Sequence, residues 1–213
     1  MKVILFGAPG SGKGTQAVMI GEFFGLKRIS LGDIFREEVK KSTDLGKQVK
    51  NFMDRGELVP DDLVQRVIDA YLNDERFILD GYPRNLNQAK ALEETLKKKG
   101  KDLDVFIYLE IDSQTIIERL SKRRVCKGCG ANYHLENMPP KKDNVCDLCG
   151  KELFQRDDDK IEVIKKRWEV FIDRSQQLLD FYEKKGKLLK VDGSGDKDKV
   201  FQRIKEKLPC QKL

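Results

Sequence analysis

The sequence predicts an α/β fold in which helices flank a doubly wound, parallel sheet. Short apolar segments alternate with longer amphipathic ones along most of the chain, the order that parallel strands with crossover helices require. A glycine-rich loop directly follows the first apolar segment, as it does where a parallel strand leads into an anion-binding helix. The length of 213 residues is enough for one such domain with insertions.

Five short apolar segments are the expected strands. They span residues 2–6, 27–30, 76–80, 104–110 and 187–191. The helical patterns cover residues 13–24, 61–73, 86–99, 113–123, 160–184 and 196–208. Asp61, Ser113 and Asp196 are the expected starts of three of these helices, and Gly100 and Gly186 follow helix ends rich in lysine.

Two segments interrupt this alternation. Residues 30–59 contain two short amphipathic helical patterns with no strand between them. Residues 124–155 lose helical periodicity and hold four of the five cysteines. The fifth, Cys210, lies alone near the C-terminus, and we expect no chemical role for it.

Composition favours a protein that works in the cytoplasm on an anionic ligand. The net charge of +6 comes from 42 basic and 36 acidic residues that are mixed along the chain, which does not by itself indicate nucleic acid. No apolar run approaches the roughly 20 residues that span a bilayer, and the N-terminus enters a strand without a signal-peptide pattern. We therefore expect no membrane partner, and nothing requires more than a monomer.

Residues 7–15, which read Gly-Ala-Pro-Gly-Ser-Gly-Lys-Gly-Thr, are the predicted phosphate-binding loop. Glycines permit a sharp turn after the strand, and successive N–H groups can then surround an anion at the positive end of the next helix. Lys13 adds a mobile charge for the outer phosphates. The strict pattern has Ser or Thr directly after the lysine, whereas here Gly14 intervenes and Thr15 carries the hydroxyl that can ligate Mg²⁺. A glycine-rich turn without a ligand is the alternative.

The four clustered cysteines predict a zinc site. Cys126 and Cys129 form one pair, Cys146 and Cys149 form another, and sixteen residues separate the pairs. This spacing is typical of a structural site with four thiolates. Two disulfides are the alternative, which a reducing compartment disfavours. The only histidine, His134, is not an expected ligand. Acidic residues offset the lysines of this segment, so a structural clip is favoured over nucleic-acid binding.

A further cluster follows the expected strand at 76–80. Asp80 ends this strand beside the predicted phosphate loop, where a carboxylate that orders the water around Mg²⁺ belongs. Arg84 follows the turn formed by Gly81, Tyr82 and Pro83, at the sheet edge where ligands bind in such folds. A solvated surface arginine is the alternative for Arg84.

With these motifs the chain resembles the adenylate kinases, over essentially its whole length. The motifs occur in the family's order and are Gly7–Thr15, Gly32-Asp33, Asp80–Arg84, Arg123-Arg124, Arg156 with Asp158-Asp159, and Lys166-Arg167. The cysteine-bearing segment resembles the zinc-containing lid of bacterial long-form members. The resemblance implies a P-loop nucleoside monophosphate kinase fold, with a five-stranded parallel sheet flanked by helices and two mobile inserts. The implied divisions are a core at 1–29, 60–121 and 160–213, an AMP-binding insert at 30–59 and a zinc-binding lid at 122–159.

The resemblance also implies roles for individual residues. ATP would be bound by Gly10, Ser11, Gly12, Lys13, Gly14, Thr15, Arg119, Arg123, Asn132, Tyr133 and the turn at 192–195 with Gly195. AMP would be bound by Leu31, Arg36, Glu57, Leu58, Val59, Gly81, Tyr82, Pro83, Arg84, Gln88, Arg156 and Arg167. The catalytic groups would be Lys13, Arg84, Arg123, Arg156, Asp158, Asp159 and Arg167. The zinc ligands would be Cys126, Cys129, Cys146 and Cys149.

The implied activity is reversible, Mg²⁺-dependent phosphoryl transfer from ATP to AMP, which gives two ADP. The implied catalytic residues suit phosphoryl transfer to a phosphate acceptor. A phosphate acceptor, with its second pKa of about 6, is already ionised at neutral pH and needs no general base. Catalysis then consists of positioning and charge neutralisation.

Two departures from the family leave an alternative acceptor open. Leu31 stands where adenylate kinases usually have Thr, and Asn85 is shared with pyrimidine monophosphate kinases. A kinase of the same fold that prefers UMP or CMP is therefore an alternative, although Gln88 favours AMP. Phosphorylation of a hydroxyl acceptor such as a sugar would need a base, and residues 30–59 offer only Asp33, which is expected at a helix N-terminus. A third class of function left open is a zinc-ribbon module that binds nucleic acid and lies beside an ATPase domain.

Overall fold

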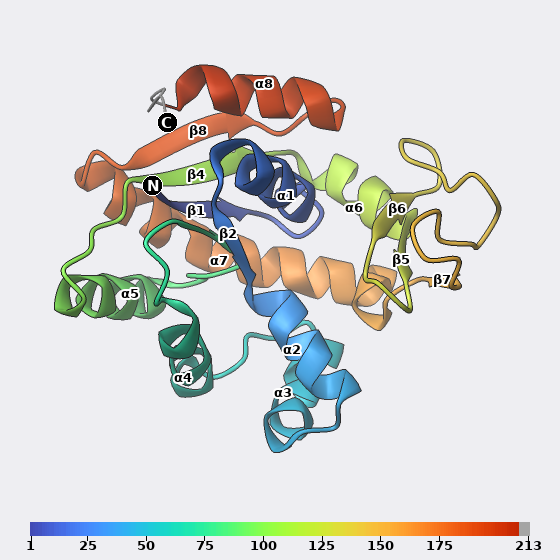
Figure 1. Cartoon of the computed structure of the whole chain (residues 1–213), viewed down its shortest axis with the longest axis horizontal. Coiled ribbons are helices and arrows are strands. Elements are labelled where there is room, and N and C mark those ends of the chain that lie inside the picture. Colours follow the sequence, from blue (N-terminus) through green and yellow to red (C-terminus); the bar gives the residue numbers. More distant parts are fainter. Residues whose placement is uncertain (209–213) are drawn as a thin grey trace.

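The computed structural model describes residues 1–208, and its centre is a parallel sheet of five strands. The strands lie in the order β2-β3-β1-β4-β8 (Figure 1). Their bounds are β1 Lys2–Gly7, β2 Lys27–Ser30, β3 Phe77–Asp80, β4 Val105–Glu110 and β8 Leu188–Asp192. The predicted fold class is confirmed, and each predicted strand is found to within one residue at either end. Cys210 lies outside the described residues.

Both faces of the sheet are covered, so the strands are apolar on both sides. Val3 and Leu5 of β1 belong to the core under α1 (Lys13–Phe24) and α8 (Lys197–Lys207). Ile4 and Phe6 point the other way, because side chains alternate along a strand. They join the larger core formed with α4 (Asp61–Tyr71), α5 (Leu86–Lys98) and α7 (Ile161–Lys184) (Figure 1).

The predicted helices are present, with small corrections at their ends. Asp196 caps α8 as expected, since its carboxylate accepts from the N–H of Lys199 at 2.9 Å. The predicted start at Ser113 is confirmed, since α6 spans Ser113–Ser121, and Asp112 caps it by accepting from the N–H of Thr115. Pro60 precedes α4, so Asp61 is its first helical residue rather than its cap. Gly100 and Gly186 follow their helices with positive φ, as expected.

Residues 30–59 form the two expected short helices, α2 (Leu31–Lys40) and α3 (Asp44–Asp54), which pack against each other. The contact is tight at Gly46 of α3, where an added Cβ would lie 2.2 Å from the carbonyl oxygen of Glu38. This distance leaves no room for a side chain.

The cysteine-bearing segment forms a separate antiparallel sheet in the order β6-β5-β7. Its strands are β5 Arg123–Cys126, β6 Asn132–His134 and β7 Leu153–Phe154. A short 3₁₀ turn at Asp157–Asp159 then leads into α7. The predicted loss of helical periodicity is confirmed, and the helix predicted to reach residue 123 ends at Ser121 because the chain enters β5. Within residues 1–208, no helix has both the length and the apolar character that crossing a bilayer requires.

Candidate active site

The loop between β1 and α1 turns on glycines. Gly10 and Gly12 have φ values of 79° and 90°, which side chains disfavour. A Cβ on Gly10 would also lie 2.9 Å from Leu120 Cγ. A Cβ on Gly14 would meet only ordinary van der Waals contacts, so no steric clash requires a glycine between Lys13 and Thr15. The loop places backbone N–H groups at the N-terminus of α1, where they and the helix dipole favour an anion.

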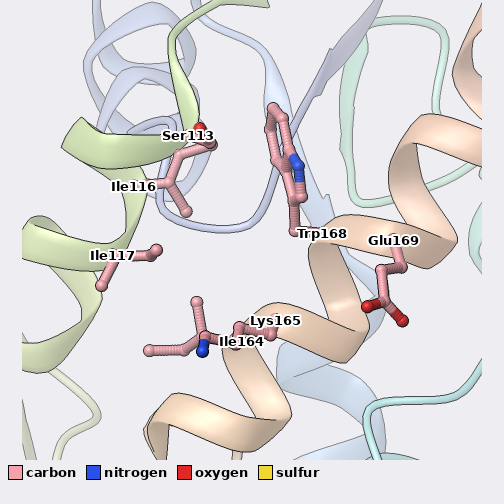
Figure 2. A pocket seen from close by; sticks show the side chains of 7 residues that line it. All are labelled: Ser113, Ile116, Ile117, Ile164, Lys165, Trp168 and Glu169. Carbon is pink, nitrogen blue, oxygen red and sulfur yellow. The ribbon is translucent and has the colours of Figure 1, made fainter.

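The packing of α6 against α7 supports the loop between β1 and α1. Ile116 and Leu120 of α6 and Ile164 of α7 are buried together with Ala8 of the loop. Figure 2 shows Ile116 and Ile117 facing Ile164 and Trp168 across a small groove between the two helices. This groove is apolar on both sides and contains none of the predicted site residues, so we regard it as part of the packing under the loop.

Lys13 folds back over the loop that precedes it. Its Nζ donates to the carbonyl oxygens of Gly7 and Ala8, at 2.7 Å in each case. Burial lowers the pKa of Lys13 to about 7, although Asp80 acts in the opposite direction. A phosphate group beside Nζ would favour the charged form and raise this pKa. Lys13 is therefore placed to respond to an anionic ligand.

Arg84 follows the turn after β3 and faces the same region. Its Nε donates to the carbonyl oxygen of Gly81 at 2.8 Å. Burial and the nearby charge of Arg167 lower the pKa of Arg84 to about 10. Two neighbouring guanidinium groups repel each other unless an anion lies between them, so their proximity indicates a site for negative charge.

Three more arginines of the site come from the cysteine-bearing segment, the turn that follows it and α7. Arg123 of β5 donates two hydrogen bonds to the buried carboxylate of Asp159. Arg167 of α7 lies 2.9 Å from a carboxylate oxygen of Asp158. Arg156 donates to the side-chain oxygen of Asn132 at 3.3 Å. Asp158 and Asp159 therefore hold two of the predicted catalytic arginines.

These guanidinium groups influence one another across the site. Burial, together with Arg36 and Arg123, lowers the pKa of Arg156 to about 9. Burial also lowers the pKa of Arg167, and the charges of Arg123 and Arg36 add to this effect. The carboxylates present are fewer than the cations, so the site has excess positive charge. The structure thus brings together six predicted groups, namely Lys13, Arg36, Arg84, Arg123, Arg156 and Arg167.

Arg119 lies on the other flank of the loop, beside the turn after β8. Its guanidinium donates to the carbonyl oxygens of Gly193, at 3.2 Å, and Gly195, at 3.0 Å. A Cβ on Gly12 would lie 4.0 Å from Arg119 Nη1. Arg119 is therefore bound to the predicted adenine turn and lies beside the predicted phosphate loop.

The predicted acceptor pocket has an apolar wall. Leu31, Val59 and Tyr82 are buried in the larger core, and Leu58 and Pro83 adjoin this wall in sequence. Glu57 lies at its edge, 3.5 Å from Arg55. Leu31, which replaces the usual Thr, is 3% exposed and packs as a core residue.

Gln88, the predicted reader of the base, is held by the protein itself. Its Oε1 accepts from the N–H of Arg84 at 2.8 Å, and its Nε2 donates to Asp61 at 2.7 Å. These bonds fix the orientation of the amide and tie it to the turn that carries Arg84.

The four cysteines form one cluster. Their Sγ atoms all lie within 4.8 Å of one another, with Cys126–Cys149 at 3.3 Å and Cys129–Cys146 at 3.5 Å. Sulfur atoms in a disulfide are about 2.05 Å apart, whereas a tetrahedral zinc site with Zn–S bonds of about 2.3 Å separates them by roughly 3.8 Å. The donor set and the spacing therefore fit zinc.

Tyr133 belongs to this cluster as well. Its hydroxyl lies 3.5 Å from Cys146 Sγ and accepts from the N–H of Asp147 at 2.8 Å. The hydroxyl is therefore engaged within the cysteine segment, and the predicted contribution of Tyr133 to ATP binding stays a prediction.

One charged residue near the phosphate loop was not among the predicted site residues. Arg28 of β2 donates to Asp80 at 2.9 Å and to Asp33 at 2.7 Å. The available signal was an arginine inside a short strand, next to the apolar Ile29. Asp33 lies in the first turn of α2, as expected, and also pairs with Arg36.

Comparisons with known proteins agree over nearly the full chain. A family model described as adenylate kinase matches residues 5–187. An adenylate kinase of Caldanaerobacter subterraneus subsp. tengcongensis is 47% identical over 212 residues, which are 98% of this chain and 96% of the relative. An adenylate kinase of Methanosarcina mazei is 49% identical over 209 residues, 96% of this chain and 97% of the relative. One of Bacillus licheniformis is 49% identical over 212 residues, 98% of each chain.

Proposed function

The chain belongs to the adenylate kinase family, and on this premise we propose that it transfers a phosphoryl group reversibly from Mg²⁺-bound ATP to AMP and forms two ADP. The enzyme is a phosphotransferase. The observation that carries the choice of substrates is the gathering of Lys13 and five arginines in one site, with Lys13 on the phosphate loop. Two nucleotides that meet through their phosphates bring enough negative charge to balance such a set.

The donor half of the proposed site is the phosphate loop with its flanks. The loop amides and Lys13 bind the ATP phosphates, as the helix N-terminus favours. Arg119 and the turn at Gly195 border the adenine, and Arg119 is held by its hydrogen bonds to the carbonyl oxygens of Gly193 and Gly195. Asn132 and Tyr133 approach from β6. Thr15 and Asp80 are the groups at hand for Mg²⁺, which neutralises phosphate charge when bound.

The acceptor half is the wall formed by α2, α3 and the turn after β3. Arg36 and Arg84 grip the phosphate of AMP, and Gln88 reads the base. Arg84 and Gln88 are coupled by the hydrogen bond from the Arg84 N–H to the Gln88 amide. The base and the phosphate of the acceptor are therefore held by one rigid turn.

The chemistry proposed for this arrangement needs no general base. The acceptor phosphate is already ionised at neutral pH, since its second pKa is about 6. Arg123, Arg156 and Arg167 stabilise charge on the transferring group, and Asp158 and Asp159 hold two of these arginines in place. The acceptor must also outcompete water, so the site has to close around the nucleotides.

The two inserts are the segments that would close the site around the nucleotides. We propose that residues 30–59 move as the AMP-binding insert and residues 122–159 as the lid, around the core of residues 1–29, 60–121 and 160–213. The mutual packing of α2 and α3 and the separate three-stranded sheet support units that move as bodies. Opening of the lid and release of product then limit turnover.

Zinc in this proposal has a structural role. Cys126, Cys129, Cys146 and Cys149 hold one Zn²⁺, and four thiolates leave no open coordination position for chemistry. The ion stiffens the lid. We also propose that the protein is a monomer and works in the cytoplasm, where thiols stay reduced.

One assay tests the function. The protein is given Mg²⁺ and ADP alone, and ATP and AMP are measured over time. We expect both products in equal amounts, because a reversible kinase whose acceptor is AMP converts two ADP into one ATP and one AMP. ADP that is left unchanged would refute the proposal and favour a UMP or CMP kinase of the same fold, a hydroxyl-acceptor kinase or a nucleic-acid-dependent ATPase. A panel of AMP, CMP and UMP with ATP then tests the acceptor, and faster turnover of CMP or UMP would replace AMP in the proposal.

A further inference from the structure

Arg28 places a cation under the phosphate loop. In the parallel pairing of β2 with β3, Arg28 lies opposite Ile78 and Ser30 lies opposite Asp80. Residues two apart share a face of the sheet, so Arg28 and Asp80 lie on the face that α1 covers. A Cβ on Gly14 would lie 3.7 Å both from the Arg28 guanidinium and from the Asp80 carboxylate. Arg28 is therefore next to the first turn of α1.

Arg28 also begins a chain of ion pairs that ends at the acceptor side. One guanidinium nitrogen, Nη2, bonds Asp80 at 2.9 Å and Asp33 at 2.7 Å. The other oxygen of Asp33 accepts from Arg36 at 2.5 Å. Although burial alone would raise it, Arg36 and Arg28 hold the pKa of Asp33 well below its usual range. The chain Asp80–Arg28–Asp33–Arg36 thus joins the end of β3 to α2.

Packing alone does not account for this position. The N-terminus of α1 is already positive and Lys13 adds to it, so a further cation there is unfavourable without its two carboxylates. Arg28 Nε is buried and has no hydrogen-bond partner among residues 1–208, and an unsatisfied buried donor is unfavourable. A neutral side chain of similar size would avoid both costs.

Asp33 is shared between Arg28 and Arg36, and this sharing explains the effect of the chain of ion pairs. With Arg28 present, the charge of Asp33 is divided between two guanidinium groups. Without Arg28, Asp33 would bind Arg36 alone and would oppose the approach of a phosphate to it. Arg36 is the group that the proposed function assigns to the acceptor phosphate. We propose that Arg28 is a positioning residue that neutralises Asp33 and so leaves Arg36 available for the phosphate of the acceptor nucleotide.

The test compares steady-state kinetics of R28Q and wild type, with AMP varied at saturating MgATP and then the reverse. This inference rests on the proposed function. We expect the KM for AMP to rise about tenfold in R28Q, the change that loss of one charge-assisted hydrogen bond typically causes. We expect kcat to stay within about twofold and the KM for MgATP within about threefold. R28K keeps a cation that can reach both carboxylates, so it should restore most of the affinity for AMP. R28M, which fills the same space, serves if R28Q does not fold.

K27Q is the matched control. Lys27 is the preceding residue of β2 and pairs on the surface with Asp74 at 2.8 Å. It should keep wild-type constants. The double variant R28Q/D33N should show the same KM for AMP as D33N, because Arg28 acts through Asp33.

Two results would overturn the role of Arg28 while leaving the proposed function intact. One is a KM for AMP in folded R28Q within twofold of wild type. The other is an equal rise of both KM values. Absence of ADP disproportionation by wild type would refute the proposed function and the acceptor role of Arg28 together.

Discussion

The Arg123 guanidinium holds the Asp159 carboxylate with two hydrogen bonds, Nε to Oδ2 at 2.8 Å and Nη2 to Oδ1 at 2.5 Å. Arg123 begins β5, and Asp159 ends the turn before α7. The pair therefore closes the cysteine-bearing segment at its base. The side chain of Asp159 is fully buried, and this makes the pair sensitive to loss of either charge.

The first prediction concerns this pair. D159N keeps the shape of the side chain but removes its charge, and it leaves Arg123 partly buried without its counter-ion. We expect the free energy of unfolding in urea to fall by about 3 kcal/mol and kcat to fall at least tenfold, because Arg123 loses its orientation. D157N is the control, since Asp157 is 79% exposed and, among residues 1–208, forms an ion pair only with Lys160 on the surface. Wild-type stability in D159N would show that the pair does not close the segment.

The second prediction concerns Lys13 and protons. With a pKa of about 7, Lys13 is mostly neutral in the free enzyme at pH 8. Bound phosphate favours the ammonium form and raises the pKa, so ATP binding at pH 8 should take up a proton. We expect an uptake of roughly 0.5–0.9 proton, measured by calorimetry in two buffers of different ionisation enthalpy. K13M should abolish the uptake. Equal binding heats for wild type in the two buffers would contradict the shifted pKa.

The local elements of the fold could be predicted from the sequence because their signals are local. Apolar runs located the five strands, and the paired Cys-x-x-Cys spacing located the sulfur cluster. The start of α6 at Ser113 was predicted correctly, but the residue that caps it was not identified, because two good caps are adjacent. Asp112 and Ser113 are both suitable, and the structure uses Asp112.

Long-range pairs within the site had no such signal. Arg28 and Asp80 are 52 residues apart, and Gln88 and Asp61 are 27 apart. No periodicity connects them, and only strand register and helix packing bring them together. The same reason hid the use of the Tyr133 hydroxyl by Cys146 and Asp147, since side-chain direction in a three-residue strand depends on its neighbours.

The third prediction concerns the contact between α2 and α3. G46A would place a Cβ 2.2 Å from the Glu38 carbonyl oxygen and 2.7 Å from the Val39 nitrogen. Both are backbone atoms, so the helices must separate. We expect the variant to lose about 2 kcal/mol of unfolding free energy, within the usual range for overpacking. G14A is the control for stability, because its Cβ meets only contacts of 3.7 Å and alanine is the better helix former. Thermal unfolding that is unchanged in G46A would contradict the tight contact.

The fourth prediction concerns the cysteine cluster. Wild-type protein should contain one zinc per chain by elemental analysis, and C129S should lose it, because three thiolates and a hydroxyl bind zinc more weakly. We expect the melting temperature of C129S to fall by at least about 5 °C, the shift that roughly 2 kcal/mol causes in a chain of this size. Turnover at moderate temperature should stay within threefold, since four thiolates leave the ion no open coordination position for chemistry. C210S, which keeps all four clustered thiols, is the matched control and should retain both zinc and stability. A mass two hydrogens lower per cysteine pair in the purified wild type would instead identify disulfides, and loss of turnover in folded, zinc-free C129S would contradict a purely structural ion.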